Sequence, residues 1–235
     1  MPDPMRNENP VCGVDMGIKA MAVVSDGTAF ENPQALKRNL TRIKRLQRRV
    51  SRRKKGSANR RKAVQQLATA HQRVANIRKD ALHQATSQLA KNKSAVVLEN
   101  LHVGGMMKNH PLAQAIGDVG FYEFKRQLQY KGQWYGCEVM FADRFYPSSK
   151  TCSRCGAVKP VLGLEESTYH CEACGLEMDR DLNAAINLEQ LYYTTASSAG
   201  SNACGEDVRP VAMRADLGEA GTKRQTINAY VCVQM

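Results

Sequence analysis

Four cysteines arranged in two pairs form the clearest chemical pattern in this sequence. Cys152 and Cys155 are separated by two residues, as are Cys171 and Cys174, and fifteen residues lie between the pairs. This spacing is typical of zinc sites, because each pair can place two thiolates at corners of one tetrahedron. We therefore predict that these four cysteines bind a structural Zn2+ in a ribbon that spans residues 148–178.

An acidic residue follows the cysteine cluster at the start of a predicted final helix, residues 179–191. Asp181 lies seven residues past Cys174, so we expect the ribbon to position this carboxylate. Asp179 competes for the same role, but the preference for Asp at helix N-caps favours Asp179 as the cap and Asp181 as the functional acid. Arg180 could neutralise a phosphate or pair with a surface acid, and the sequence favours neither.

Two further acids stand at the ends of apolar, strand-like runs. Asp15 ends the run 11–15, and Glu99 follows the apolar part of the run 94–101. Three converging carboxylates suit phosphodiester hydrolysis by two cations about 3.5–4 Å apart, one activating water and one stabilising the leaving oxygen. Oxygen ligands select Mg2+ or Mn2+. We predict that Asp15 bridges the two cations, and that Glu99 and Asp181 each complete one coordination shell.

The elements that must position these acids follow an α/β order. Antiparallel strands are predicted at 11–15 and 21–25, with an Asp-Gly hairpin turn and a third strand from residue 28. A strand at 94–101, a flexible loop at Gly104–Gly105, a helix at 112–135 and a strand at 137–143 follow. This order indicates an RNase H-like fold, in which the first and fourth strands are neighbours and bring Asp15 and Glu99 together.

Residues 33–92 interrupt this order with a strongly basic helical hairpin. The segment holds 18 Lys and Arg residues against one acid, Asp80, and apolar residues recur every three or four positions on both sides of a turn at 54–59. Such charge density on one element favours a polyanionic partner such as nucleic acid. The residues that we expect to bind nucleic acid are Arg45, Arg48, Arg49, Arg52, Arg53, Lys54, Lys55, Arg60, Arg61 and Lys62.

The composition of the 235 residues excludes several classes of protein. The N-terminus has no apolar signal segment, and no apolar run is long enough to span a membrane. We therefore expect a reducing, cytoplasmic compartment, in which the cysteine pairs bind metal and Cys12 and Cys137 are small buried side chains. We expect residues 1–10 to form a leader, and the Ser-, Ala- and Gly-rich tail at 192–235 to be disordered.

Several collinear motifs resemble the TnpB (OrfB) family of insertion-sequence proteins, which are related to type V CRISPR effectors. The resemblance covers roughly residues 11–191 and is specific. The motifs are Gly13-Val14-Asp15-Met16-Gly17-Ile18-Lys19, Arg52-Arg53-Lys54-Lys55-Gly56-Ser57-Ala58-Asn59-Arg60, Val97-Leu98-Glu99-Asn100-Leu101, Ser148-Ser149-Lys150-Thr151-Cys152-Ser153-Arg154-Cys155-Gly156 and Asp179-Arg180-Asp181-Leu182-Asn183-Ala184-Ala185.

This resemblance implies a RuvC-like nuclease core at 11–147, with an inserted zinc ribbon, that cuts DNA directed by a guide RNA transcribed from the same element. It also implies Asp15, Glu99 and Asp181 as the catalytic acids. Family members usually carry a wedge and recognition region before the first strand, and here ten residues precede Val11. Two alternatives therefore remain: a remnant that binds nucleic acid without cutting it, and a zinc-stabilised adaptor between proteins, against which the basic hairpin argues.

Overall fold

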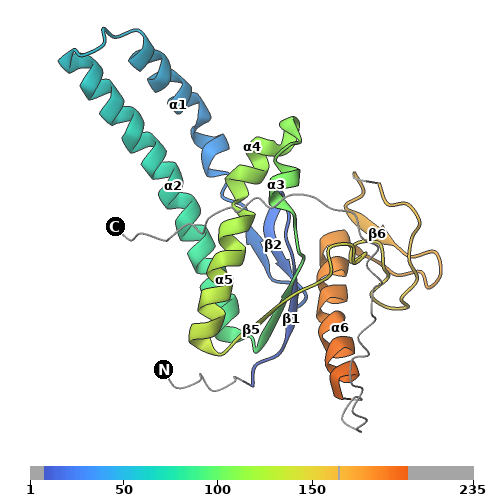
Figure 1. Cartoon of the computed structure of the whole chain (residues 1–235). Helices are drawn as coiled ribbons and strands as arrows, with labels where there is room; N and C mark the ends of the chain where they lie inside the picture. Colours follow the sequence, from blue (N-terminus) through green and yellow to red (C-terminus); the bar gives the residue numbers. More distant parts are fainter. Residues whose placement is uncertain (1–7, 164, 201–235) are drawn as a thin grey trace, which may run out of the picture.

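The computed structural model of the protein describes residues 8–163 and 165–200 (Figure 1). At its centre is a mixed sheet in the order β3-β2-β1-β4-β5. Strand β1 is antiparallel to β2, and β2 to β3, whereas β4 is parallel to both β1 and β5. The predicted adjacency of the first and fourth strands is confirmed. The bounds are β1 Cys12–Asp15, β2 Ala20–Val24, β3 Ala29–Glu31, β4 Ala95–Leu98 and β5 Glu138–Phe141.

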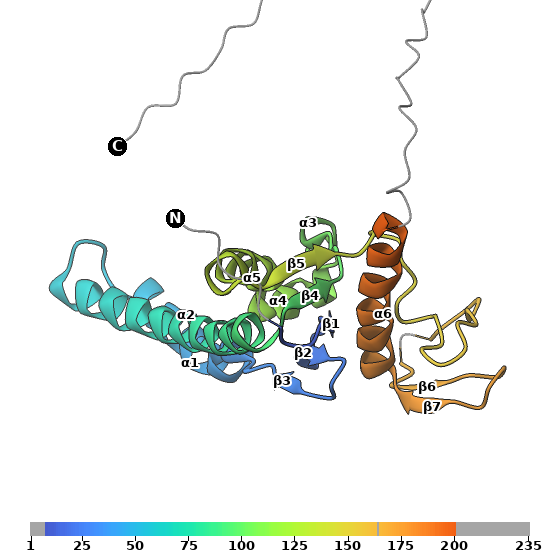
Figure 2. The same cartoon turned by 90° about the horizontal axis from the view of Figure 1, so that it is seen from below.

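Helices cover both faces of this sheet because side chains alternate along its strands. Val14, Val96 and Leu98 point into the main core, which they share with apolar residues of α2 (Ala58–Asn92) and α5 (Phe121–Tyr135). Val97 faces the opposite way and packs with Leu188 of α6 (Arg180–Gly200). Figure 2 shows the sheet between α2 and α5 on one side and α6 on the other.

The predicted helical hairpin is present and projects away from the sheet (Figures 1 and 2). Helix α1 (Ala35–Ser51) packs antiparallel against the first half of α2 along a narrow apolar seam. Four residues of this seam are Ile43, Leu46, Ala70 and Val74. The second half of α2 packs on α5 and belongs to the main core, so one long helix joins the hairpin rigidly to the sheet.

The connection between β4 and β5 differs from the sequence prediction in two places. A short helix, α3 (Val103–Met106), replaces the flexible loop predicted at Gly104–Gly105, because the carbonyls of His102 and Val103 accept backbone hydrogen bonds one turn on. The single helix predicted at 112–135 is two helices, α4 (His110–Val119) and α5. Gly120 separates them with φ of 80°, a left-handed conformation that ends a helix and that glycine adopts without steric cost.

The cysteine-containing lobe holds a two-stranded antiparallel sheet, β6 (Thr168–His170) and β7 (Glu177–Asp179), and leads directly into α6.

Helix α6 continues to Gly200, so the disorder predicted from residue 192 is wrong for 192–200. Tyr192 packs on the Leu188 cluster, and the Thr194 and Thr195 hydroxyls donate to the Leu191 carbonyl. The rest of that predicted tail, with Cys204 and Cys232, lies outside the described residues, as does most of the predicted leader. None of the helices within the described ranges combines the length and apolar character needed to cross a bilayer.

Candidate functional site

Strand register places two of the predicted acids side by side. Val14 of β1 pairs with Leu98 of the parallel strand β4, so Asp15 and Glu99 occupy equivalent positions at the carboxyl ends of neighbouring strands. Helix α6 brings the third acid to the same edge, because Asp181 lies in its first turn and the helix packs closely on β1. All three side chains are half-buried, which leaves them open to a ligand from solvent.

The proximity of the three acids affects the pKa of Asp15. Burial raises the pKa of the Asp15 carboxyl well above its usual range, and the charges of Glu99 and Asp181 raise the pKa further. Arg180 acts in the opposite direction; its Nε atom is 3.7 Å from the Asp181 carboxylate. One partly exposed cation does not neutralise three acids, and the remaining negative charge is what a divalent cation would balance.

The acids are close, but they do not form a compact ligand shell for one ion. Among residues 8–163 and 165–200, the four cysteines are the one set of three or more potential ligands whose donor atoms all lie within 4.8 Å of one another. A pair of cations about 3.5–4 Å apart relaxes this requirement, because each acid then needs to reach one cation and one acid reaches both. The donor set of three carboxylates suits Mg2+ or Mn2+ in that arrangement.

Asp179 caps the N-terminus of α6, as the preference for Asp at helix N-caps predicted. Its Oδ1 atom accepts hydrogen bonds from the backbone N–H groups of Asp181, at 2.9 Å, and Leu182, at 3.1 Å. These groups are two of the unpaired donors at the N-terminus of α6. The Asp179 carboxylate is thereby committed to the helix, and Asp181 remains the acid that α6 offers to the site.

Ser148 is a site residue that sequence reasoning did not find. It is buried, and its hydroxyl donates a short hydrogen bond to the Glu99 carboxylate. The backbone of Ser148 is itself held by α6, because the Asn187 side chain donates to the carbonyls of Ser148 and Thr151, both at 2.7 Å. Asn183, one turn earlier, donates to the same Thr151 carbonyl. The segment that enters the cysteine lobe is therefore fixed between Glu99 and α6.

The four cysteines fit a zinc ion. Their Sγ atoms are 3.6 Å apart in the pairs Cys152–Cys174 and Cys155–Cys171. A tetrahedron with Zn–S bonds of about 2.3 Å has sulfur atoms about 3.8 Å apart, so little movement is needed to bind the ion. A backbone hydrogen bond from Cys174 lowers the pKa of Cys171 to about 6, whereas burial and the neighbouring thiols raise the pKa of Cys174 to about 12, so Cys171 is the first of these two to supply the thiolate that a metal requires. The cluster rests on the fully buried Tyr169.

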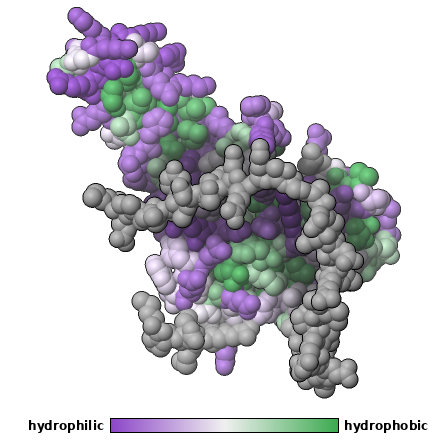
Figure 3. All heavy atoms as spheres, in the orientation of Figure 1, coloured by the Kyte–Doolittle hydropathy of each residue, from purple (hydrophilic) through white to green (hydrophobic). Residues whose placement is uncertain are grey.

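The predicted nucleic-acid-binding residues belong to the end of α1, the start of α2 and the turn between them, and this end of the hairpin projects away from the sheet (Figure 1). Nine of the ten are exposed, and Arg60 is half-buried. Figure 3 shows this end of the molecule covered by hydrophilic side chains around a strip of apolar surface. One open hollow of about 600 Å³ is lined by Arg45, Arg48, Arg49, Arg52 and Arg53. Repulsion among these guanidinium groups favours an anionic ligand in the hollow.

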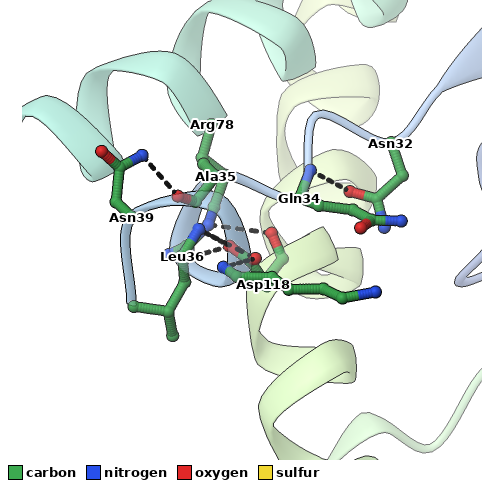
Figure 4. Close-up of polar contacts among 8 residues, drawn as sticks. Asn32, Gln34, Ala35, Leu36, Asn39, Arg78 and Asp118 are labelled. Carbon is green, nitrogen blue, oxygen red and sulfur yellow. Dashed lines mark hydrogen bonds and ion pairs between the residues drawn. The ribbon is translucent and has the colours of Figure 1, made fainter. Parts of the chain in front are cut away.

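The root of the hairpin is fastened by an acid that no sequence pattern indicated. Asp118, buried at the end of α4, accepts hydrogen bonds from the backbone N–H groups of Leu36 and Lys37 in the first turn of α1 (Figure 4). Arg78 of α2 donates to the same carboxylate at 2.9 Å and to the Asp118 carbonyl at 2.9 Å. One side chain thus joins both arms of the hairpin to α4.

Comparison with known proteins assigns this arrangement to a family. The family model described as "Probable transposase" (OrfB_IS605) matches residues 2–110, and the "Cas12f1-like, TNB domain" model matches residues 121–188. A Streptomyces pristinaespiralis protein named "Putative RNA-guided DNA endonuclease" is 38% identical over 213 residues, which cover 91% of this chain and 51% of that protein. The chain belongs to the TnpB (OrfB) family. The two TnpB family matches include the three acids, the four cysteines and the basic hairpin.

Further relatives agree with the TnpB assignment. "Putative RNA-guided DNA endonuclease InsQ" of Escherichia coli K12 is 33% identical, covering 88% of this chain and 53% of that protein. The fold is shared with a cryo-EM structure of a Cas12f1–sgRNA–target DNA complex, with a TM-score of 0.56 and 19% identity over 80% of this chain and 50% of that one. This TnpB chain spans about half the length of the curated relatives that it matches.

Proposed function

We propose that this chain carries the RuvC-like, RNase H-like nuclease core of an RNA-guided DNA endonuclease. In this proposal residues 11–147 and the helix from 179 form the core, residues 148–178 form a zinc ribbon, and Asp15, Glu99 and Asp181 hold two Mg2+ or Mn2+ ions. DNA and a guide RNA would be the partners, as the names of the relatives suggest.

One observation carries the proposal: three acids from distant parts of the chain meet at one edge of the sheet. Burial raises the pKa of Asp15 above its usual range, and the neighbouring charges of Glu99 and Asp181 raise the pKa further, which supports a site of concentrated negative charge. A protein gains no stability from such an arrangement, because like charges in a partly buried site repel. A cluster of this kind is therefore expected where cations and a phosphodiester bind.

The residues around the acids have separable tasks. When bound, the two cations would supply an activated water and stabilise the leaving oxygen. Asp15, between the other acids, would contact both cations. Ser148 holds the Glu99 carboxylate in one orientation, and Asp179 fixes the helix turn that presents Asp181. Arg180 stands beside Asp181 and could contact a phosphate oxygen once the acids are neutralised.

The test is cleavage of end-labelled single-stranded DNA by the purified chain with Mg2+, with and without the RNA that copurifies with it. Asp15→Asn should abolish cleavage, because the bridging carboxylate is lost while the side-chain volume is kept. Asp80→Asn is the matched control, since Asp80 lies on the exposed face of α2 and, within residues 8–163 and 165–200, its carboxylate accepts a hydrogen bond from Gln84 alone. Equal cleavage by wild type and Asp15→Asn would contradict the proposal.

A second candidate, nucleic-acid binding without cleavage, is favoured by the arginine-lined hollow of the hairpin. Both candidates predict binding that weakens steeply with salt, because each neutralised phosphate contributes about −0.9 to the slope of log K against log salt for duplex DNA. Replacing Arg48, Arg49, Arg52 and Arg53 by Gln should make that slope shallower by about 3 to 4. Binding that lacks any Mg2+-dependent cleavage would select the second candidate.

A further inference from the structure

Helix α5 presents a line of aromatic and arginine side chains that its packing does not require. Tyr122, Arg126, Tyr130 and Trp134 are four residues apart, which places them along one side of the helix. The apolar positions that pack α5 on the sheet are different residues, among them Phe124 and Leu128. Tyr122 is 70% exposed and Trp134 is 67% exposed. We call these four residues the α5 stripe.

Three of the four side chains of the α5 stripe contact one another in sequence. The Arg126 guanidinium lies 5.4 Å from the centre of the Tyr130 ring, and the rings of Tyr130 and Trp134 meet edge to face with centroids 4.7 Å apart. Two hydrogen bonds join the edge of the guanidinium to the carboxylate of Glu123, at 2.7 and 2.8 Å. The ion pair neutralises Glu123 and leaves the flat faces of the guanidinium for stacking.

A cavity lies between Glu99 and the first residues of the α5 stripe. It has a volume of about 310 Å³, and Glu99 lines it together with Tyr122 and Arg126. Apolar side chains that include Met16, Leu98, Leu101 and Phe121 form much of its wall, and His102 and Gln129 add polar groups. Pockets for small ligands begin at about this volume and combine apolar walls with a few polar groups. A single nucleobase meets that description.

Lys125 supplies positive charge beside the same cavity. Its Nζ atom donates to the Asn100 side chain at 3.2 Å and lies 4.0 Å from the centre of the Phe141 ring. Asn100 directly follows Glu99 in the chain, so the Lys125 ammonium is held where the phosphate of a nucleic-acid strand next to the acids would pass. Cationic groups combined with aromatic faces are the usual means of binding single strands, because every base has a face that can stack.

We propose that the cavity and the α5 stripe bind single-stranded DNA: the cavity takes one base beside Glu99, and the following bases stack along Tyr122, Arg126, Tyr130 and Trp134. This proposal rests on the proposed nuclease function, which supplies the choice of DNA and the position of the strand relative to the acids. A duplex does not fit, because its bases already stack on one another and hide the faces that these side chains would contact.

Trp134 is the only tryptophan of the chain, so the intrinsic fluorescence of the protein reports directly on the α5 stripe. The full chain is titrated with a short oligothymidylate without added Mg2+, and binding is followed in parallel by the anisotropy of a labelled strand. Saturation should quench the Trp134 emission. Tyr122→Ala should weaken binding by about 5- to 100-fold, as expected for the loss of one stacked base.

Two variants separate the α5 stripe from the rest of the surface. Tyr193→Ala removes an exposed tyrosine of α6, about 18 Å along that helix from Asp181, and should leave affinity and quenching unchanged. Replacing Arg48, Arg49, Arg52 and Arg53 by Gln should weaken binding but preserve the quenching at saturation. Quenching that disappears in this hairpin variant at saturation would overturn the proposal.

The remaining outcomes are equally decisive. Unchanged Trp134 emission at saturation would overturn the proposal, and so would quenching by oligouridylate but not by oligothymidylate. Emission that changes with protein concentration alone would instead assign the α5 stripe to contact between two copies of the chain. Quenching by a protein that cleaves no DNA would uphold the stripe and refute the nuclease function, whereas cleavage without quenching would refute the stripe alone.

Discussion

The contact between Gly13 and α6 allows a sharp test of how Asp15, Glu99 and Asp181 are brought together. A Cβ atom at residue 13 would lie 2.0 Å from the Ala185 carbonyl oxygen, 2.4 Å from the Glu189 nitrogen and 2.8 Å from the Leu188 Cβ. Ordinary contact begins at 3.4 Å, so Gly13→Ala requires α6 to recede by about 1.4 Å. The obstacle is helix backbone, which no change of rotamer relieves.

The cost follows from this displacement. Overpacking of a core costs about 1–3 kcal/mol, and a chain of this size loses about 2–4 °C of melting temperature per kcal/mol, so Tm should fall by about 2–12 °C. Because α6 carries Asp181, Mg2+-dependent cleavage should fall further than stability; a misplacement of about 1 Å costs on the order of 100-fold. Cleavage is measured well below the Tm of the variant, where the chain is folded.

Gly117→Ala is the matched control. Gly117 lies inside α4, and its nearest neighbour would be the Met107 Cε at 3.6 Å, an ordinary contact. Alanine is favoured over glycine within a helix by about 0.5–1 kcal/mol, so Tm should stay the same or rise slightly. If Gly13→Ala melts and cleaves like the wild type, the packing of α6 on β1 does not position Asp181 and the reasoning fails.

Three other predictions test the same machinery. Without added divalent cations, Asp15→Asn should raise Tm at pH 7. Because the pKa of Asp15 is raised in the folded state, the protonated carboxyl favours folding below about pH 4, and this contribution is lost as pH rises through the folded-state pKa. The difference in Tm between variant and wild type should therefore widen from pH 4 to pH 8. A gap that shrinks with pH would refute this sign. Ser148→Ala should weaken Mg2+ affinity about 10- to 100-fold, measured from the Mg2+ dependence of cleavage, with Ser149→Ala unchanged. Asp118→Asn should lower Tm, because α1 loses a cap worth about 0.5–2 kcal/mol, whereas Asp80→Asn should not.

The parts of the fold that were predictable are those in which local pattern and topology agree. Apolar runs that end in acids indicated β1 and β4, and parallel pairing then required Asp15 and Glu99 to be neighbours. Regular apolar spacing indicated both arms of the hairpin. The cysteine spacing predicted a cluster that the structure forms, because each pair closes locally around its own turn.

The missed features depend on partners that are distant in the chain. Asp118 looks like an isolated acid in an apolar helix, and its partners are 40 and about 82 residues away. Ser148 is one of two adjacent serines, and only the tertiary fold directs it to Glu99, 49 residues away. The end of α6 was missed because residues 194–200 lack an apolar stripe, although the helix continues from the turns that Tyr192 holds in place.

The position of the cysteine lobe gives the proposed enzyme a second metal requirement. Strand β7 ends at Asp179, the residue that caps the start of α6, and Asn183 and Asn187 tie the other end of the lobe to the same helix. Zinc loss or thiol oxidation in the lobe would therefore loosen Asp181 and Ser148 together, while the sheet and its main core stayed intact. A cell short of zinc would then hold a folded protein whose nuclease is switched off.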